Sequence, residues 1–267
     1  MKIGFFITAR LKSSRLKLKI LKSLNGYSVI DRVIQRAKHV VECDDIVLCT
    51  STNSQDLPLI RVAQKHDIYY FNGDPGDVLK RLNDAATLFN VDYIVGITAD
   101  NPLFSIRYAN LIVNKVLQDP TIDYIYSTGN PIGMNMYAIN SKALKVVCNI
   151  KDEIDTEIWG RLLNRPELFN VVEVHTEEQD VIDVERVTLD EPKDYEFLKF
   201  IFDSFDKDYI IEEKDLINIL NINPDIVNIN KNVRQMDLDK SIVDRIDNFY
   251  KCNYDRIVEV KSKIYNQ

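Results

Sequence analysis

The sequence predicts an α/β fold in which a mostly parallel sheet is flanked by helices. In the first 100 residues, short apolar runs alternate with segments whose apolar residues recur at helical spacing. This alternation is typical of parallel strands joined by right-handed crossovers. The first apolar run also leads directly into a strongly basic segment. Ligands bind open α/β sheets at the carboxyl ends of their strands, so this segment lies where a site is expected.

Strands and helices alternate regularly as far as residue 100. Ser28 is placed to cap the first helix, and Asp77 or the preceding Gly76 to cap the third, since short polar side chains accept hydrogen bonds from the first free amide groups. The predicted strands cover residues 3–7, 44–52, 68–71 and 91–100, and the predicted helices cover residues 28–42, 57–66 and 77–89.

The second half of the chain is less regular. From Asn221 the pattern loosens into a loop or extended arm, and a polar helix is expected at residues 237–250. We therefore divide the chain into a domain of residues 1–225 and a C-terminal extension of residues 226–267 that carries this helix. Before the arm, the predicted strands cover residues 122–128, 134–140 and 169–176, and the predicted helices start at Ser141 and cover residues 154–164 and 191–205.

Composition and charge exclude several classes of protein. The 267 residues are 45% hydrophobic, as in ordinary globular proteins, and the net charge of −7 argues against a general nucleic-acid binder. No run approaches the ~20 apolar residues that cross a bilayer, and the opening run is too short for a signal peptide. We expect a cytoplasmic protein that binds neither nucleic acid nor membrane.

The cysteines and histidines do not form a metal-binding or catalytic pattern. The chain has four cysteines and three histidines, which are dispersed and include no CxxC pair. Such spacing fits reduced thiols and excludes a cysteine zinc site. A histidine-centred metal site or a Ser/His/Asp triad is not expected either.

The basic segment that follows the first strand points to an anionic ligand. Six cations between residues 10 and 22 stand in a chain that is acidic overall. Charge of this density at a strand end suits a polyphosphate. The alternative is a solvated basic loop without a ligand. The six cations are Arg10, Lys12, Arg15, Lys17, Lys19 and Lys22.

Two acids follow predicted strands, far apart in the sequence. Asp100 ends the strand at 91–100, and Asp190 precedes a helix that begins at Glu191-Pro192. Two such carboxylates could converge on Mg²⁺, which takes one or two carboxylates and fills its other positions with phosphate oxygens and water. The alternative for either acid alone is a helix cap. Cations together with a metal are what nucleotidyl transfer requires.

The motifs around these residues resemble those of a known family. ARLKSSRLKLKIL (9–21) is similar to the ARLxSxRLPGKxL signature of cytidylyltransferases that make CMP-activated acidic sugars: the 3-deoxy-manno-octulosonate and acylneuraminate enzymes and their spore-coat polysaccharide relatives. DVLKR (77–81), ADNPL (99–103) and VTLDEPKDYE (187–196) resemble the DVLxR, GDCPL and VTVDTPEDYE of the spore-coat branch. The resemblance spans residues 2–205 and implies a Rossmann-like fold of the nucleotide-diphospho-sugar transferase (GT-A-like) type.

The resemblance also implies a reaction and its site residues. It implies in-line attack of a sugar oxygen on the α-phosphate of CTP, with release of pyrophosphate and with Mg²⁺ as cofactor, for surface polysaccharide or glycan biosynthesis. Arg10, Arg15 and Lys19 match catalytic positions that hold the phosphates, and Asp100 and Asp190 match the metal ligands. The nucleotide-binding residues that it implies are Thr8, Ala9, Arg10, Ser13, Lys19, Asp77, Arg81 and Asp100.

The sequence departs from the family pattern at several places. Lys17-Leu18 replaces a Pro-Gly pair, so we expect a differently shaped loop, because glycine lets the backbone wrap a phosphate closely. GMNMY (133–137) stands where relatives commonly read GLDVE, which makes Asn135 and Tyr137 candidate acceptor-binding residues. Asp155 and Glu157, near the single tryptophan, Trp159, are further acceptor candidates; the alternative is a surface acid pair beside a core tryptophan.

The sequence leaves other partners and functions open. The family's members are usually homodimers, which implies a homodimer here, with residues 130–170 as an acceptor and dimer subregion. An enzyme of the same fold could use another nucleoside triphosphate or a sugar phosphate acceptor. A non-catalytic nucleotide-binding relative is a further alternative. A glycosyltransferase is disfavoured because ADN at residues 99–101 supplies no Asp-x-Asp motif.

Overall fold

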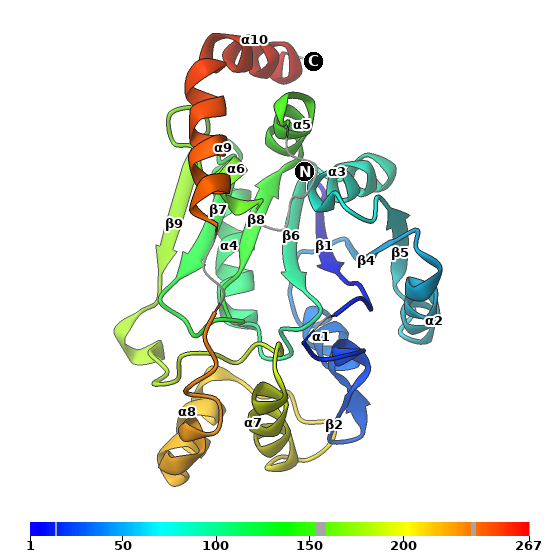
Figure 1. The fold of residues 1–267 in the computed structure, drawn as a ribbon, viewed down its shortest axis with the longest axis vertical. Coiled ribbons are helices and arrows are strands. Elements are labelled where there is room, and N and C mark those ends of the chain that lie inside the picture. Colours follow the sequence, from blue (N-terminus) through cyan, green and yellow to red (C-terminus); the bar gives the residue numbers. More distant parts are fainter. Residues whose placement is uncertain (14, 153–158, 236–238, 267) are drawn as a thin grey trace.

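In the computed structural model, which describes residues 1–13, 15–152, 159–235 and 239–266, seven strands form the main sheet (Figure 1). Their order across the sheet is β5-β4-β1-β6-β8-β7-β9. The strands are β1 (Ile3–Thr8), β4 (Asp45–Ser51), β5 (Tyr69–Gly73), β6 (Tyr93–Thr98), β7 (Tyr124–Thr128), β8 (Tyr137–Asn140) and β9 (Val171–His175).

The sheet is mostly parallel, as the sequence predicts. β5, β4, β1 and β6 pair in parallel, and so do β7 and β9. Strand β8 alone among the paired strands of this sheet runs antiparallel to its neighbours, β6 and β7. Because β6 and β1 are adjacent and parallel, their carboxyl ends lie side by side and open onto the same edge.

Helices cover both faces of the sheet, because side chains alternate between the faces along each strand. In β1, Phe5 and Ile7 pack in one core with α1, α2 and α4. Phe6 points to the opposite face and packs with α3 and α5. The helices of these two layers are α1 (Val29–Ala37), α2 (Pro58–Lys65), α3 (Val78–Phe89), α4 (Ile106–Gln118) and α5 (Ser141–Ile150).

A third core lies beyond the carboxyl edge of the sheet. There α7 (Pro192–Asp203) and α8 (Glu213–Ile222) pack around Val187, Leu189 and Phe197, all buried. Leu24, in the small hairpin of β2 (Ser23–Leu24) and β3 (Tyr27–Ser28), joins the same core. We call α7, α8 and the β2–β3 hairpin the lower body, which Figure 1 shows beneath the strand ends. It fixes both the end of the basic segment and the chain around Asp190.

Three helices go beyond those predicted from the sequence: α4, α8 and α10 (Tyr254–Tyr265). The predicted polar helix is present as α9 (Lys240–Cys252), and residues 224–228 of the predicted loop form a 3-10 turn. In the predicted helix at 154–164, α6 covers Gly160–Leu163, and residues 153–158 lie outside the described part of the chain.

The C-terminal helices return to the main body. Ile246 and Tyr250 of α9 and Ile257 and Ile264 of α10 are buried in the core that contains α3 and α5. A boundary at residue 225 stays a prediction. Within the described ranges, no helix is both long and apolar enough to cross a membrane.

The carboxylate of Asp31 in α1 is almost fully buried and contacts residues at the end of α2. Its Oδ1 lies 2.6 Å from Nε2 of His66 and 3.0 Å from Nζ of Lys65, and its Oδ2 accepts a hydrogen bond from the Ser28 backbone amide. Ser28 is the N-cap of α1, as predicted. Burial by itself would raise the pKa of Asp31, but hydrogen bonds from His66, Ser28 and Lys65 outweigh it and hold the pKa well below its ordinary value.

We predict that Asp31→Asn lowers the free energy of unfolding by about 1–3 kcal/mol near pH 7, because charge-assisted hydrogen bonds and part of a helix cap are lost. A depressed pKa in the folded state contributes stability that is complete above the ordinary value, near 4, and is lost as the pH falls below it. Urea denaturation at about pH 7 and about pH 3 should therefore show a smaller difference between the two proteins at the lower pH. An equal difference at both would contradict the assignment.

Candidate active site

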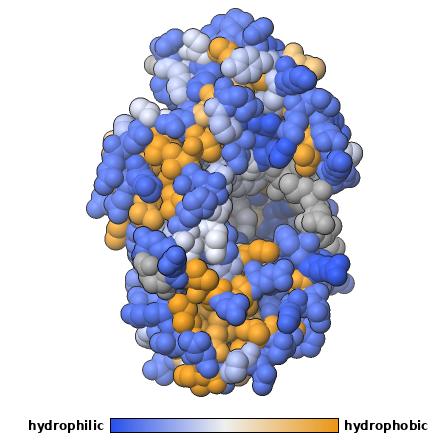
Figure 2. Space-filling model, turned by 90° about the vertical axis from the view of Figure 1, so that its left-hand side faces the viewer, coloured by the Kyte–Doolittle hydropathy of each residue, from blue (hydrophilic) through white to orange (hydrophobic). Residues whose placement is uncertain are grey.

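A cavity of about 530 Å³ opens at the carboxyl ends of β1 and β6. The surface is hollowed at mid-height, between the sheet and the lower body (Figure 2). Cations, acids, hydroxyls and amides make up most of the wall. The lining residues are Thr8, Ala9, Arg10, Lys12, Ser13, Arg15, Lys19, Ile20, Val78, Arg81, Thr98, Ala99, Asp100, Asn101, Ile132, Gly133, Trp159, Thr188, Asp190 and Gln235.

The basic segment forms one side of this cavity. It leaves β1 at Thr8 and is tied down at Leu11, whose backbone amide donates to Oδ1 of the fully buried Asp56 at 2.6 Å. Leu18, at the position where the related signature has glycine, adopts the left-handed conformation with a φ of 51°. That conformation costs a residue with a side chain about 1–2 kcal/mol. The turn places Lys19 at the cavity wall while Lys17 is exposed and outside it.

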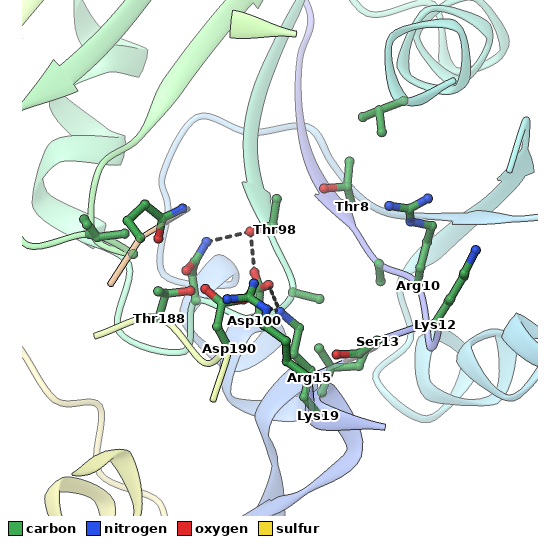
Figure 3. A pocket seen from close by; sticks show the side chains of 18 of the residues that line it. Thr8, Arg10, Lys12, Ser13, Arg15, Lys19, Thr98, Asp100, Thr188 and Asp190 are labelled. Carbon is green, nitrogen blue, oxygen red and sulfur yellow. Dashed lines mark hydrogen bonds and ion pairs between the residues drawn. The ribbon is translucent and has the colours of Figure 1, made fainter. Parts of the chain in front are cut away.

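Lys19 lies between the two acids singled out from the sequence (Figure 3). Its Nζ is 2.5 Å from Oδ2 of Asp100 and 2.9 Å from Oδ1 of Asp190. All three side chains are 12–20% exposed. Burial alone would lower the pKa of Lys19, but the two carboxylates raise it above its ordinary value. The amine is therefore charged, and both carboxylates face one cation.

Asp190 is held as an anion by several cations. Arg15 Nη2 is 3.1 Å from its Oδ1, and Arg186 Nη2 is 2.8 Å from its Oδ2. Burial would raise the pKa of Asp190, but the attraction of Lys19, Arg15 and Arg186 outweighs it and lowers the pKa below its ordinary value. The alternative role as a helix cap is not observed, because the N-cap of α7 is Glu191.

Asp100 is oriented by its neighbours in the turn after β6. Thr98 Oγ1 donates to Oδ1 of Asp100 at 2.5 Å, and Asn101 Nδ2 donates to Thr98 Oγ1 at 2.6 Å (Figure 3). The backbone amide of Leu189 donates to the Asp100 carbonyl at 2.9 Å, which joins the two acid-bearing segments. Asn101, at a departure from the family motif, thus supports the Asp100 carboxylate through Thr98.

The donor set of this site fits a magnesium ion. Mg²⁺ binds one or two carboxylates and keeps positions for phosphate oxygens and water. Asp100 and Asp190 already direct one oxygen each toward a single ammonium group. In the described ranges, no group of three or more His, Cys, Asp or Glu side chains could hold a metal, so a cage made of protein ligands alone is not found there.

Arg10 and Arg81 lie at the other end of the cavity. Arg10 Nη1 donates to the Pro75 carbonyl at 3.1 Å, and Arg81 Nε donates to the Asp74 carbonyl at 3.1 Å. Arg81 is 1% exposed. Burial, followed by repulsion from Arg10, lowers its pKa below the ordinary value. Two close guanidinium groups favour an anion between or beside them.

Some predicted site residues are placed away from the cavity wall. Asp77 caps α3 by accepting from the Lys80 amide at 2.9 Å, and its other oxygen pairs with Lys151. Asn135 Nδ2 donates to the Asn130 carbonyl at 3.2 Å. Neither residue lines the cavity. Their predicted nucleotide-binding and acceptor-binding roles stay predictions.

Of the remaining acceptor candidates, Tyr137 lies against Trp159. The ring of Tyr137 packs against Trp159 with centroids 4.6 Å apart, and an added Cβ on Gly96 would overlap the Tyr137 hydroxyl. Trp159 lines the cavity and Tyr137 lies behind it. Asp155 and Glu157 fall outside the described residues.

Several wall residues were not singled out from the sequence: Thr98, Thr188, Gly133 and Gln235. Thr98 and Thr188 each precede a predicted acid by two positions, a signal that could have found them. Gly133 is the first residue of GMNMY (133–137), a segment that departs from the family pattern. Gln235 has no local signal, because only the path of the C-terminal chain brings it to the wall.

Comparison with known proteins gives consistent matches. A family model described as "Cytidylyltransferase" matches residues 5–219. An uncharacterized protein from Methanocaldococcus jannaschii is 31% identical over 237 residues, which are 88% of this chain and 97% of that protein. The spore coat polysaccharide biosynthesis protein SpsF of Bacillus subtilis is 27% identical over 230 residues, which are 84% of this chain and 95% of SpsF.

Solved structures agree with these matches. A cytidylyltransferase from Leptospira borgpetersenii superposes with a TM-score of 0.79 at 26% sequence identity. The match covers 89% of this chain and 100% of that one. The similarity therefore extends over most of this chain.

We predict that Gly133→Ala destabilises the cavity wall. Gly133 has a φ of +100°, and an added Cβ would lie 2.7 Å from the Thr188 backbone nitrogen and 3.0 Å from Asn101 Oδ1. A loss of about 1–3 kcal/mol in the free energy of unfolding is expected from strain at such a position. Gly76→Ala is the matched control, since its nearest atom would be 3.8 Å away. Urea denaturation of both variants tests this, and equal stabilities would contradict it.

Proposed function

The chain belongs to the cytidylyltransferase family, and from this premise we propose that it transfers CMP from CTP to a sugar or sugar-like acceptor, with Mg²⁺ as cofactor. It is a nucleotidyltransferase by family. The nucleotide CTP, the sugar-like acceptor and Mg²⁺ are parts of this proposal. The name of SpsF, in spore coat polysaccharide biosynthesis, supports a role in making surface polysaccharide.

One observation carries this proposal: Asp100 and Asp190 share the ammonium group of Lys19 at the edge of a cation-lined cavity. Nucleotidyl transfer needs positive charge around a triphosphate and carboxylates that can hold a metal. The cavity supplies both within one wall. A nucleotide-binding protein without catalysis would need the cations but not the paired acids.

The residues of the cavity have distinct proposed roles. Asp100 and Asp190 hold Mg²⁺, which when bound neutralises charge on the phosphate oxygens. With these carboxylate oxygens engaged by a metal, Lys19 would release at least one acid and would be available to a phosphate. Arg10 and Arg15 neutralise further phosphate charge.

In the proposed reaction, one bond to the α-phosphorus forms and one bond to it breaks. The acceptor oxygen bonds to the α-phosphorus of CTP and gives its proton to solvent water, while the bond from that phosphorus to the bridging oxygen breaks and pyrophosphate leaves. Arg15 and Lys19 stabilise the charge that develops on the phosphate oxygens.

We further propose a cytoplasmic homodimer in which residues 130–170 contact the partner.

A pyrophosphate-release assay tests the proposal directly. The purified protein with Mg²⁺ is supplied with each common nucleoside triphosphate, paired with nonulosonic acids, 3-deoxy-octulosonate, sugar 1-phosphates or polyol phosphates. We expect release with CTP that depends on one acceptor. Release with another triphosphate would overturn the choice of base and favour the alternative of a same-fold enzyme with another nucleotide. No release despite measurable CTP binding would favour a non-catalytic protein.

We predict that Lys19→Ala lowers kcat/KM by about 30- to 1,000-fold, because removing one charge-stabilising group costs about 2–4 kcal/mol in the transition state. Lys17→Ala is the matched control: it removes the same charge from the same segment at an exposed position outside the cavity. Equal rates for the two variants would reduce the segment to a solvated basic loop.

We predict that Asp100→Asn abolishes turnover while the protein keeps its fold, since the carboxylate lies at a strand end and is not packed in a core. Steady-state kinetics and thermal melting measure the two effects. Activity near that of the unmodified protein would show that Asp100 holds no essential metal.

A further inference from the structure

The chain between α8 and α9 has no role in the reaction described above, but it contacts residues of the site. We call residues 223–235 the C-terminal arm. It lies beyond residue 219, where the family match ends. Figure 1 shows it rising from the lower body at α8 toward α9. Ile226 anchors its start in the core of α7 and α8.

Asn230 is the buried polar residue of the arm, 2% exposed. Its Nδ2 donates to Oδ1 of Asp194 at 3.1 Å and to the carbonyl oxygen of Arg186 at 3.3 Å. Both partners are themselves buried, at 0% and 1% exposure. A buried amide with these two partners holds the segments that carry them together, because a lost partner would leave polar groups unsatisfied.

Asp194 connects Asn230 to the segment that bears Asp190. Its Oδ2 accepts hydrogen bonds from the backbone amides of Asp190 and Glu191, both at 3.0 Å. It also forms an ion pair with Arg186, with Nε 3.0 Å from Oδ1. The carboxylate of Asp194 therefore fixes the backbone at the position where Asp190 leaves the chain.

Arg186 completes the connection at the side chain of Asp190. Its Nη2 lies 2.8 Å from Oδ2 of Asp190 and 3.2 Å from Oδ2 of Asp194. The other oxygen of Asp190, Oδ1, faces Lys19 and Arg15. One oxygen is thus engaged inside the protein while the other is turned to the cavity.

The far end of the arm also reaches this site. Gln235 lines the cavity, and its Oε1 accepts from Arg186 Nη1 at 3.4 Å. Arg186 is therefore contacted by the arm at two points, through its own carbonyl and through its guanidinium group.

We propose that Asn230, acting through Asp194 and Arg186, is a positioning residue that keeps Oδ1 of Asp190 directed into the cavity. The C-terminal arm is then part of the catalytic apparatus, because it sets the affinity of Asp190 for a cation. This inference rests on the proposed function, in which Asp190 holds the metal. Asn230 touches neither Asp190 nor the cavity wall, so it is not itself a catalytic residue.

The test is the affinity of the full-length protein for Mn²⁺, a spectroscopic probe for the magnesium site, measured by the electron paramagnetic resonance signal of the free ion. Asn230→Ala is expected to weaken Mn²⁺ binding by about 5- to 30-fold, the effect of losing one or two hydrogen bonds. Asn230→Asp, which puts an acceptor against Asp194, should weaken it further. Asn228→Ala, an exposed position on the same arm, should leave it unchanged.

Stability is measured alongside, because a purely structural role would lower the melting temperature and leave the Mn²⁺ affinity of the folded protein intact. That result would overturn the proposal. Should Asn230→Ala fail to fold, Asn230→Ser keeps a small donor at the site, and its Mn²⁺ affinity should be lower than that of the unmodified protein. An affinity for Asn230→Ser equal to that of the unmodified protein would overturn the proposal.

A further control separates this inference from the proposed function. Asp190→Asn should lose Mn²⁺ binding, and an unchanged affinity would overturn both the metal role and the positioning role. The Mn²⁺ measurement requires no turnover. A silent pyrophosphate assay, with Mn²⁺ affinity still reduced in Asn230→Ala, would refute the reaction and support the positioning.

Discussion

The shared ion pair of Lys19 with Asp100 and Asp190 is the interaction on which the organisation of the site depends. It joins three segments that are far apart in the sequence: the loop after β1, the turn after β6 and the approach to α7. Without a cation between them, two close carboxylates would repel each other. The loop cation thus offsets this repulsion and holds the two acids around one ammonium group.

The surrounding structure serves to hold these three segments in place. Asp56 fixes the start of the loop at Leu11, Thr98 orients Asp100, and Arg186 engages one oxygen of Asp190. The contacts of Asp56 and Arg186 are buried or partly buried, where hydrogen bonds are strong and a missing partner is costly. The site is therefore rigid at its acids, while the cations of the outer loop are more exposed.

Much of the fold and the family membership could be predicted from the sequence, because the relevant signals are local. The run from β1 to β6 shows apolar periodicity, capping residues such as Ser28, and short connections, and the four strands pair in parallel as predicted. The motifs around Arg10, Asp100 and Asp190 carried the family resemblance, which the family match confirms. The metal and the acceptor stay predictions.

Other features could not be predicted because they depend on contacts across long sequence distances. Strand β8 lies between β6 and β7 and runs antiparallel to both, an arrangement set in part by pairing with β6, which is distant in the sequence. The buried state of Asn230 depends on residues 36 and 44 positions away in the chain. Helix α4 is not among the predicted helices although its sequence does carry local signals, since it is amphipathic and is capped by Ser105.

The return of α10 to α5 has a consequence for synthesis of the protein on the ribosome. The side chains of α9 and α10 complete a core whose other members include residues of β1, α3 and α5. Tyr265 and Lys261 also donate to the carboxylate of Asp123, which is 3% exposed. A nascent chain that ends before these helices leaves the apolar face of α5 open to water, and incompletely covered apolar surface favours aggregation. Final consolidation of this core must therefore wait until α10 has left the exit tunnel.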